Sequence, residues 1–259
     1  MPKLAANLSF LFQELPLLER FAAAAAAGFK GVELLFPYEV PAGAIAERLE
    51  RHGLTLALFN VPPGDGERGC GALPWRERDC IAAIERALAY AAATSCRRIH
   101  VLSGVWPEGR PKREGDTVLV ANLRRAAELA SAQGVRLLIE PINPRDLPGY
   151  FLNTPEHAVA ILDQVGQGNV ELQLDLYHCQ IMAGDLARHL RQLAGRYGHI
   201  QIAGVPDRHE PDRGEINYPY LFELMDELGY QGWVGCEYHP ADGTLAGLGW
   251  ARPWGIAPP

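Results

Sequence analysis

The sequence predicts a single (β/α)₈ barrel, or TIM barrel, because short β-rich runs alternate with amphipathic helical patterns along the whole chain. Several of these runs, such as RLLIEPI and VELQLDLY, are apolar over successive residues, which is typical of strands covered by helices. The main alternative is an open doubly wound sheet, which usually has a glycine-rich turn after its first strand. The segment NLSFLFQELP contains no glycine, so the closed barrel is favoured.

The elements follow one another in the order that a barrel requires. We expect strands near residues 3–9, 31–36, 55–61, 98–104, 136–142, 170–176, 199–204 and 233–238. We expect helices between them, near 16–27, 41–53, 74–95, 115–134, 154–166, 184–197 and 217–229. Thr154-Pro155 indicates an N-cap followed by a proline at the first helical position, and a glycine falls at several expected helix ends. The single domain covers residues 1–259, with an irregular C-terminal arm from about residue 240.

Composition and charge exclude several classes of function. The chain has 259 residues, 48% of them hydrophobic, and a net charge of −7, so it is a poor candidate for binding nucleic acid. Its five cysteines include no C-x-x-C pair, which indicates reduced thiols rather than a disulfide framework or a zinc ribbon. No stretch resembles a signal peptide or is long enough to span a bilayer. We therefore expect a cytoplasmic protein without a membrane partner.

The ends of the last four expected strands carry side chains with oxygen donors. They are Glu140, Asp175, Gln201 and Glu237, about one strand–helix unit apart. Because the ends of consecutive strands are neighbours at one mouth of a barrel, we expect these side chains to converge there. Three converging carboxylates would repel one another without a cation, and oxygen ligands favour Mg²⁺, with Mn²⁺ as the alternative. The other interpretation is that each acid caps the following helix or pairs with an arginine.

Ordered segments along nearly the whole chain resemble a known family. The chain resembles the hydroxypyruvate isomerases, which belong to the xylose-isomerase-like TIM barrels. The segments are AANLSFLF (5–12), GVELLFPY (31–38), LLIEPIN (137–143), QLDLYH (173–178), HIQIAG (199–204), GEINYPYLF (214–222) and GYQGWVGCEY (229–238). The stretch GVPDRHEPDRGEINYPYLF is more similar to the 2-oxo-tetronate (2-dehydrotetronate) isomerase branch, whereas IEPINPRDLPGYFL is more similar to hydroxypyruvate isomerase proper.

The resemblance implies an activity and residues that carry it. The expected reaction is metal-dependent isomerisation of hydroxypyruvate to 2-hydroxy-3-oxopropanoate through an enediolate, with 2-oxo-tetronate as the alternative substrate. By motif, the metal ligands would be Glu140, Asp175, Gln201 and Glu237, and the acid–base pair would be Glu140 and Glu237. Many sister families of sugar epimerases have a histidine where this chain has Gln201, which favours the short-acid isomerases over a ketose 3-epimerase.

Two further residues are expected to bind the substrate. Arg208 offers a planar fork to the substrate carboxylate; the alternative is that it pairs with acids of its own loop. His178 would donate to a substrate oxygen or orient Glu140; the alternative is a packed histidine bonded to backbone. For Glu33 we expect the ordinary role of a buried carboxylate paired with an arginine.

Other classes of protein share this barrel. A DNA-repair endonuclease would need a histidine-rich zinc cluster and a basic face, which this acidic chain does not offer. A catalytically inactive binding protein would not need all four strand-end side chains. The expected partner is therefore a small hydroxy-oxo acid, and the pairing of related barrels makes a homo-oligomer an open alternative to a monomer.

Overall fold

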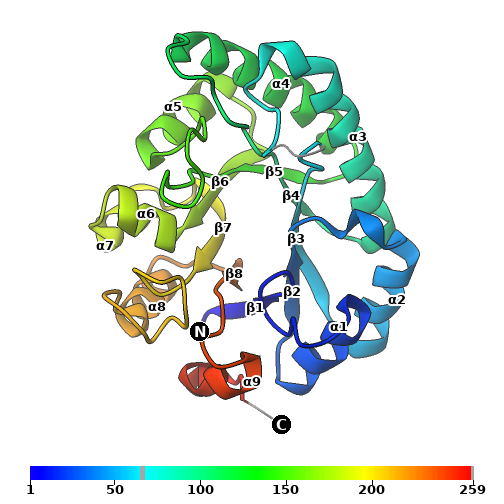
Figure 1. Cartoon of the computed structure of the whole chain (residues 1–259), viewed down its shortest axis with the longest axis vertical. Helices are drawn as coiled ribbons and strands as arrows, with labels where there is room; N and C mark the ends of the chain where they lie inside the picture. The colour runs from blue at the N-terminus through cyan, green and yellow to red at the C-terminus, as the bar shows by residue number, and fades with distance from the viewer. Residues whose placement is uncertain (65–67, 258–259) are drawn as a thin grey trace.

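The computed structural model describes residues 1–64 and 68–257. Within these residues, parallel strands form a closed barrel in the order β1 to β8, which confirms the predicted fold. Figure 1 shows the ring of strands with the helices outside it. The strands are β1 (Lys3–Asn7), β2 (Gly31–Leu34), β3 (Thr55–Asn60), β4 (Arg98–His100), β5 (Arg136–Ile139), β6 (Val170–Asp175), β7 (Tyr197–Ile202) and β8 (Trp233–Cys236).

The helices cover the barrel and begin and end close to the predicted positions. The longer ones are α1 (Leu17–Ala26), α2 (Ala42–His52), α3 (Glu77–Thr94), α4 (Lys112–Ser131), α5 (Pro155–Val165) and α8 (Tyr218–Glu227). Thr154 caps α5 as predicted, because its hydroxyl accepts a hydrogen bond from the His157 amide at 3.2 Å. Gly53 ends α2 with a φ of 62°, in the left-handed region that favours glycine. Short 3₁₀ helices, η1 (Pro37–Glu39) and η2 (Pro74–Arg76), precede α2 and α3.

The segment between β6 and β7 differs from the prediction of one helix over 184–197. It holds two short helices, α6 (Leu176–Met182) and α7 (Leu186–Gln192). The first begins directly after β6 because the Asp175 carboxylate accepts a hydrogen bond from the Tyr177 amide at 2.8 Å and so caps it. Asp175, the last residue of β6, is thus also the N-cap residue of α6.

The segment after residue 240 was expected to be an irregular arm, but it forms α9 (Thr244–Gly247) and the 3₁₀ helix η3 (Leu248–Trp254). Its tryptophans explain why it is ordered. The Trp250 indole donates to the Tyr238 hydroxyl at 3.2 Å, and the Trp254 ring lies 4.8 Å from that of Phe222 in α8. Figure 1 shows this segment, in red, beside α1 and the N-terminus.

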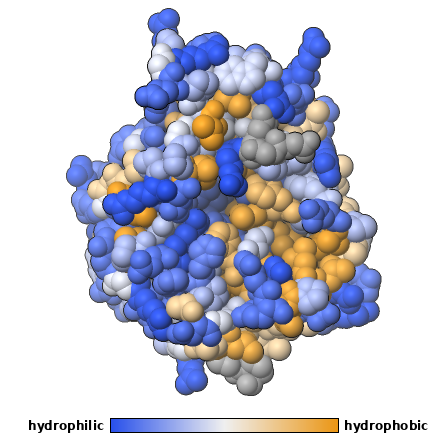
Figure 2. Space-filling view, in the orientation of Figure 1, coloured by the Kyte–Doolittle hydropathy of each residue, from blue (hydrophilic) through white to orange (hydrophobic). Residues whose placement is uncertain are grey.

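Strand register brings the predicted site side chains to the same mouth of the barrel. Asp175 pairs with Gln201 across β6 and β7, and Gln201 pairs with Gly235 across β7 and β8. Glu140 and Glu237 directly follow β5 and β8. Figure 2 shows a hydrophilic hollow near the centre of the face seen in Figure 1.

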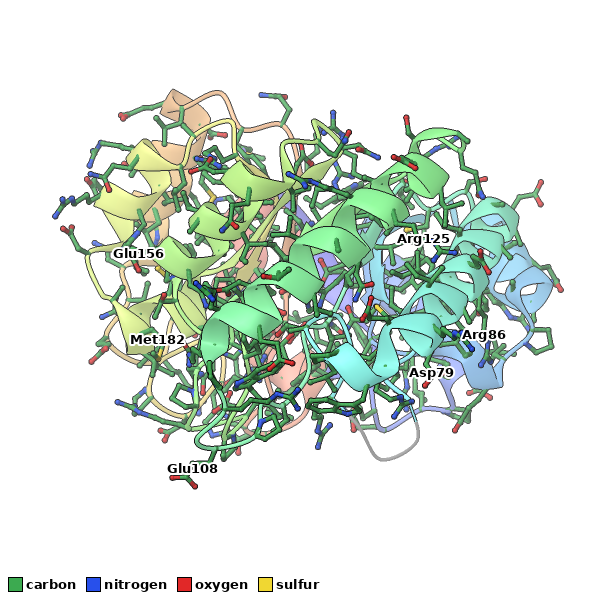
Figure 3. The ribbon with its side chains drawn as sticks, turned by 90° about the horizontal axis from the view of Figure 1, so that it is seen from above. Asp79, Arg86, Glu108, Arg125, Glu156 and Met182 are labelled. Carbon is green, nitrogen blue, oxygen red and sulfur yellow. The ribbon has the colours of Figure 1, made fainter. Side chains whose placement is uncertain are left out.

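The hydrophobic core is formed by apolar side chains of the strands and of the helices that cover them. Buried polar side chains, among them Glu33 and His199, meet between β2 and β7. Figure 3 shows the outer helices from a second direction, with charged side chains such as Glu108 pointing away from the barrel. Among the described residues, no helix is both long and apolar enough to cross a membrane.

Candidate active site

A cavity of about 220 Å³ opens at the C-terminal ends of the strands. Four predicted site residues line it: Glu140, His178, Arg208 and Glu237. The other two are buried beside them: Asp175 lies 3.5 Å from His178, and Gln201 donates a hydrogen bond to Glu237. The lining is completed by Phe10, Leu35, Phe36, Asn60, Arg68, His100, Leu102, Ile142, Asp146, Leu147 and Gln173. All six predicted residues therefore belong to one site.

Glu140, Asp175 and His178 form a group that could hold a metal ion. One ligand-type atom from each lies within 4.8 Å of the others. The His178 Nε2 atom is 3.5 Å from Asp175 Oδ2 and 4.0 Å from Glu140 Oε1. Both of these carboxylate oxygens are buried and have no hydrogen-bond partner among the described residues. The other Asp175 oxygen caps α6, so one side chain serves both the helix and the site.

Glu237 and Gln201 lie in the same site, but their polar atoms already have partners. The Glu237 Oε2 atom accepts from Asn7 at 2.8 Å and from the Gln201 amide nitrogen at 2.7 Å. The Gln201 oxygen accepts from the amide of Gln173 at 2.6 Å, while its nitrogen also donates to Glu33 at 3.1 Å. Glu237 and Gln201 therefore stand beside the Glu140–Asp175–His178 group rather than within it.

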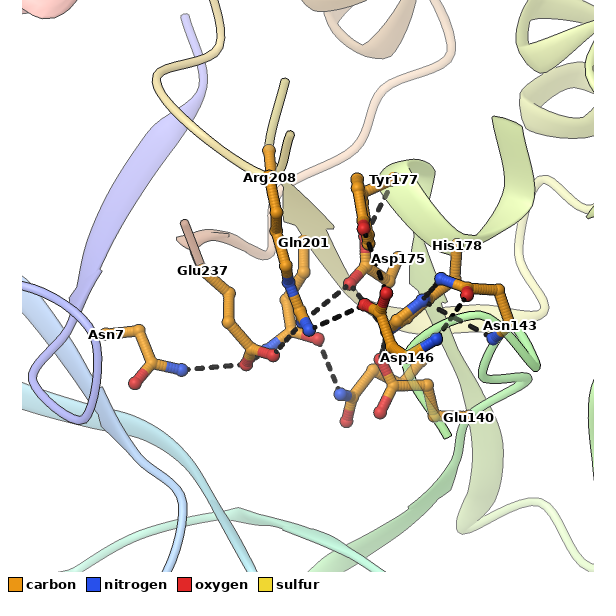
Figure 4. Close-up of polar contacts among 12 residues, drawn as sticks. Asn7, Glu140, Asn143, Asp146, Asp175, Tyr177, His178, Gln201, Arg208 and Glu237 are labelled. Carbon is orange, nitrogen blue, oxygen red and sulfur yellow. Dashed lines mark hydrogen bonds and ion pairs between the residues drawn. The ribbon is translucent and has the colours of Figure 1, made fainter. Parts of the chain in front are cut away.

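Arg208 reaches into the site instead of pairing with the acids of its own loop. It donates to Glu237 Oε1 at 2.6 Å and to Asp146 Oδ2 at 3.1 Å, and it lies 3.9 Å from Asp175 Oδ2. Its guanidinium also stacks over the rings of Phe10 and Tyr177, at 5.1 and 5.0 Å from their centroids. Figure 4 shows it between Glu237 and Asp175. These contacts place a permanent positive charge among the carboxylates.

His178 is buried beside Asn143, a residue that the sequence interpretation did not single out. The Nδ1 atom lies 2.6 Å from the Asn143 side-chain nitrogen and 3.4 Å from its backbone nitrogen. The opposite ring nitrogen, Nε2, faces Glu140 and Asp175 (Figure 4). One edge of the ring is packed and bonded to Asn143, as the alternative interpretation expected. The other edge faces the cavity, so packing alone does not describe this histidine.

Burial and mutual repulsion raise the pKa values of the carboxyl groups in the metal-free site. Burial, with the charges of Glu237 and Asp175, raises the pKa of Glu140 well above its ordinary value. Burial raises the pKa of Glu237 to about 8 and that of Asp175 to about 6, although the nearby Arg208 lowers both. Burial lowers the pKa of His100 to about 3, so this histidine, 3.5 Å from Glu140, is neutral.

The donor set fits a divalent cation that prefers oxygen ligands. Two unpartnered buried carboxylate oxygens, Glu140 Oε1 and Asp175 Oδ2, lie together. Buried polar atoms normally have a hydrogen-bond partner or a charged partner, so this pair of oxygens could bind a cation. A cation there would offset the repulsion that raises the pKa of the site carboxyls.

Several contacts of the site come from residues that were not predicted. Gln173 precedes Asp175 by two positions on β6, so strand alternation could have placed both on the same face. Asn7 ends β1 as the predicted acids end their strands, which is a comparable signal. Asp146 and Asn143 lie in the β5–α5 connection and carry no periodic signal.

Glu33 is buried as expected, but its partner is not an arginine. It contacts the imidazole of His199 and accepts hydrogen bonds from Gln201 at 3.1 Å and Asn7 at 3.4 Å. The expected pairing was wrong because the Glu33 side chain contacts residues of β1 and β7, and none of them is an arginine. Glu33 therefore supports the amides that contact Glu237.

Comparison with known proteins places this site in a family. The family model of the xylose isomerase-like TIM barrels matches residues 21–254. A 2-oxo-tetronate isomerase of Cupriavidus necator is 55% identical over 98% of this chain and 99% of its own length. The hydroxypyruvate isomerase of Escherichia coli is 42% identical over 98% of this chain and its own full length. The chain belongs to the xylose isomerase-like TIM barrel family and is an isomerase.

A solved structure supports the same fold. A protein of Brucella melitensis described as an AP endonuclease of family 2 superposes with a TM-score of 0.96 and is 49% identical. The match covers 98% of this chain and 99% of that chain. The two molecules therefore share one architecture over their whole length.

Proposed function

We propose that this protein isomerises 2-oxo-tetronate by moving the carbonyl group between C2 and C3. The observation that carries the proposal is a pair of buried glutamates, Glu140 and Glu237, that line one cavity and both have raised pKa values, mainly because they are buried. The higher identity to the 2-oxo-tetronate isomerase, 55% against 42%, supports this substrate over hydroxypyruvate. The sequence interpretation had put hydroxypyruvate first among the candidate substrates. Because of the higher identity, we now put 2-oxo-tetronate first.

The reaction needs groups that exchange protons with carbon. One carboxylate removes the proton from C3, the proton of the C3 hydroxyl passes to the C2 oxygen, and a proton returns to C2. Glu140 and Glu237 suit the two carbon steps because burial raises the pKa of both carboxyl groups, that of Glu237 to about 8, which strengthens each carboxylate as a base. General acid–base steps of this kind contribute typically about 10²–10⁴-fold.

The resident metal would be Mg²⁺, with Mn²⁺ as the alternative. We propose that Glu140, Asp175, Gln201 and Glu237 hold it. Glu140 and Asp175 would supply unpartnered oxygens, whereas Gln201 and Glu237 would turn toward the metal oxygens that now accept hydrogen bonds from Gln173 and Arg208. When bound, the metal would stabilise negative charge that develops on the substrate oxygens. Arg208 already balances part of the carboxylate charge, through its bond to Glu237 and its approach to Asp175.

Arg208 is our candidate for binding the substrate carboxylate. Its bonds to Asp146 and Glu237 hold the guanidinium at the cavity, where an incoming carboxylate meets a planar fork. Arg68 lines the same cavity but is exposed, so water screens its charge more strongly. We therefore propose that Arg208 contributes more than Arg68 to binding the substrate carboxylate.

Hydroxypyruvate remains the second candidate substrate. It is 2-oxo-tetronate without the terminal hydroxymethyl group, so both acids present the same C1 to C3 atoms to the glutamates. The identity of 42% to the hydroxypyruvate isomerase of Escherichia coli favours it specifically. An AP endonuclease activity is not supported, because the possible metal group of the described residues has one histidine and the chain carries a net charge of −7.

Turnover of both acids, measured in parallel with Mg²⁺, with Mn²⁺ and after EDTA treatment, tests the proposal. We expect metal-dependent turnover of both and a higher kcat/KM for 2-oxo-tetronate. A higher value for hydroxypyruvate would select the second candidate. No turnover of either acid with any divalent metal would refute the proposed function.

A further inference from the structure

The turn that contains Asn143 fixes which way its side-chain amide points. The Asn143 Oδ1 atom accepts hydrogen bonds from the backbone amides of Arg145 at 2.9 Å and Asp146 at 3.0 Å. A backbone N–H can only donate, so the atom that faces these two groups must be the oxygen. The Asn143 nitrogen therefore points the other way, to the Nδ1 atom of His178 at 2.6 Å.

A second donor approaches the same ring nitrogen. The backbone amide of Asn143 points to His178 Nδ1 at 3.4 Å. Two donors directed at one nitrogen require it to present a lone pair. In a neutral imidazole the single proton then belongs to the other nitrogen, Nε2. Both residues are buried, so water does not compete for these positions.

The proton on Nε2 changes what His178 can do in the site. Nε2 faces Asp175 Oδ2 at 3.5 Å and Glu140 Oε1 at 4.0 Å, two oxygens without hydrogen-bond partners. By position alone, His178 could serve as a metal ligand. A nitrogen that carries a proton has no lone pair for a metal, and a shift of that proton to Nδ1 would set it against two donors.

We propose that Asn143 is a positioning residue that holds His178 as the Nε2–H tautomer, so that His178 faces the substrate as a hydrogen-bond donor and is not a metal ligand. The identity of the substrate oxygen that receives this bond rests on the proposed function. On 2-oxo-tetronate it is an oxygen at C2 or C3, where negative charge develops and a fixed donor is most effective. The tautomer itself does not depend on the substrate.

The state of the ring can be measured directly on the intact protein. Nitrogen-15 NMR of protein labelled at histidine distinguishes a ring nitrogen that carries a proton from one that does not. The His178→Gln variant identifies the His178 signals among the eight histidines. We expect protonated Nε2 and unprotonated Nδ1 both without metal and with saturating Mg²⁺. A proton on Nδ1 in the native protein, or loss of the Nε2 proton when Mg²⁺ is added, would overturn the proposal.

The Asn143→Asp variant tests the role of the amide. Aspartate keeps an oxygen for the amides of Arg145 and Asp146, so the turn is retained, but it replaces the donor to His178 with an acceptor. We expect a proton to appear on Nδ1 of His178. The Asn153→Asp variant makes the same exchange outside the cavity and should leave the native tautomer unchanged. A native tautomer in Asn143→Asp would show that Asn143 does not set it.

Kinetics provide a separate readout. Mutation of the hydrogen-bond partners that orient metal-bound histidines typically costs about 10–100-fold. We expect an effect of similar size here, with Asn143→Asp lowering kcat by about 10–100-fold and changing KM less. If neither acid is turned over by the native protein, the proposed function fails while the NMR result still decides the tautomer. If turnover is normal but Nδ1 carries the proton, the tautomer proposal fails alone.

Discussion

The guanidinium of Arg208 donates a hydrogen bond of 2.6 Å to the carboxylate of Glu237, 29 residues along the chain. The same group bonds Asp146 and stacks between Phe10 and Tyr177. Burial lowers the pKa of Arg208, but the surrounding carboxylates more than reverse this and raise it above its ordinary value. A permanent cation thus forms part of the site before substrate arrives.

Replacement of Arg208 should weaken the binding of acid substrates. Hydrogen bonds to charged groups contribute about 1.5–3 kcal/mol, so we expect Arg208→Gln to raise KM about 10- to 150-fold. An uncharged ketose such as erythrulose should gain nothing from Arg208, so any binding of it should be little changed. Steady-state kinetics of Arg68→Gln, in the same cavity but exposed, provide the matched control. A larger increase in KM for Arg68→Gln would show that Arg68, and not Arg208, binds the substrate carboxylate.

Glu140→Gln and Glu237→Gln should each abolish most turnover while the fold is retained. The exchange keeps size and removes the group that accepts the carbon-bound proton, so we expect kcat to fall by at least about 10²-fold. Glu171→Gln is the control, because Glu171 is a half-buried carboxylate near the start of β6 that pairs with Arg136. Rates close to the native value in either site variant, with unchanged circular dichroism, would contradict the assignment.

The metal-free protein should lose stability as the pH rises. The pKa of Asp175 is raised to about 6 and that of Glu237 to about 8, so the folded state binds these protons more tightly than the unfolded chain. The stability they contribute is present at low pH and is lost as the pH rises through the folded pKa values. We expect the Tm in EDTA to fall between about pH 5 and pH 8, with a smaller fall in Glu237→Gln.

Addition of Mg²⁺ should reverse that loss. A metal binds the deprotonated carboxylates and competes with protons, so it should raise Tm more at pH 8 than at pH 5. Thermal melts at both pH values, with and without Mg²⁺, measure the difference. Greater stabilisation at pH 5, or none at either pH, would argue against a carboxylate metal site.

Gly235 on β8 should not tolerate a side chain. A Cβ atom at this position would lie 2.2 Å from Glu33 Oε1, and Glu33 contacts the buried His199 and Gln201. Overpacking of this kind typically costs about 1–3 kcal/mol, so we expect Gly235→Ala to lower the free energy of unfolding by that amount. Gly43→Ala in α2, where no atom lies within 4 Å, should be neutral or stabilising. Urea denaturation of both variants gives the comparison.

The barrel could be predicted because each strand and helix has a local signature. Thr154 caps α5 and Gly53 ends α2 through interactions within a few residues, and such signals are visible in sequence. The division of the segment after β6 into α6 and α7 could not be predicted in this way. It depends on Asp175, which sequence alone assigned to the site and which also caps a helix.

The site was predicted at the level of residues but not of atoms. Glu140, Asp175, Gln201 and Glu237 meet at one mouth because strand order requires it. Which of their polar atoms are free depends on partners far along the chain, such as Asn7, 230 residues from Glu237, and Glu33, 168 residues from Gln201. No local pattern encodes such pairs, so they emerge only when the barrel closes.

The double role of Asp175 limits how this scaffold could be redesigned. One of its oxygens holds the first turn of α6, and the other is buried beside His178 and Arg208, two residues that line the cavity. A designer who replaced it with alanine to change the chemistry would also leave the Tyr177 amide without its acceptor, at a typical cost of about 0.5–2 kcal/mol. Asparagine or serine would keep the cap and remove the charge. A new activity at this site is therefore easier to introduce if the residue at position 175 can still accept a hydrogen bond from a backbone amide than if it is apolar.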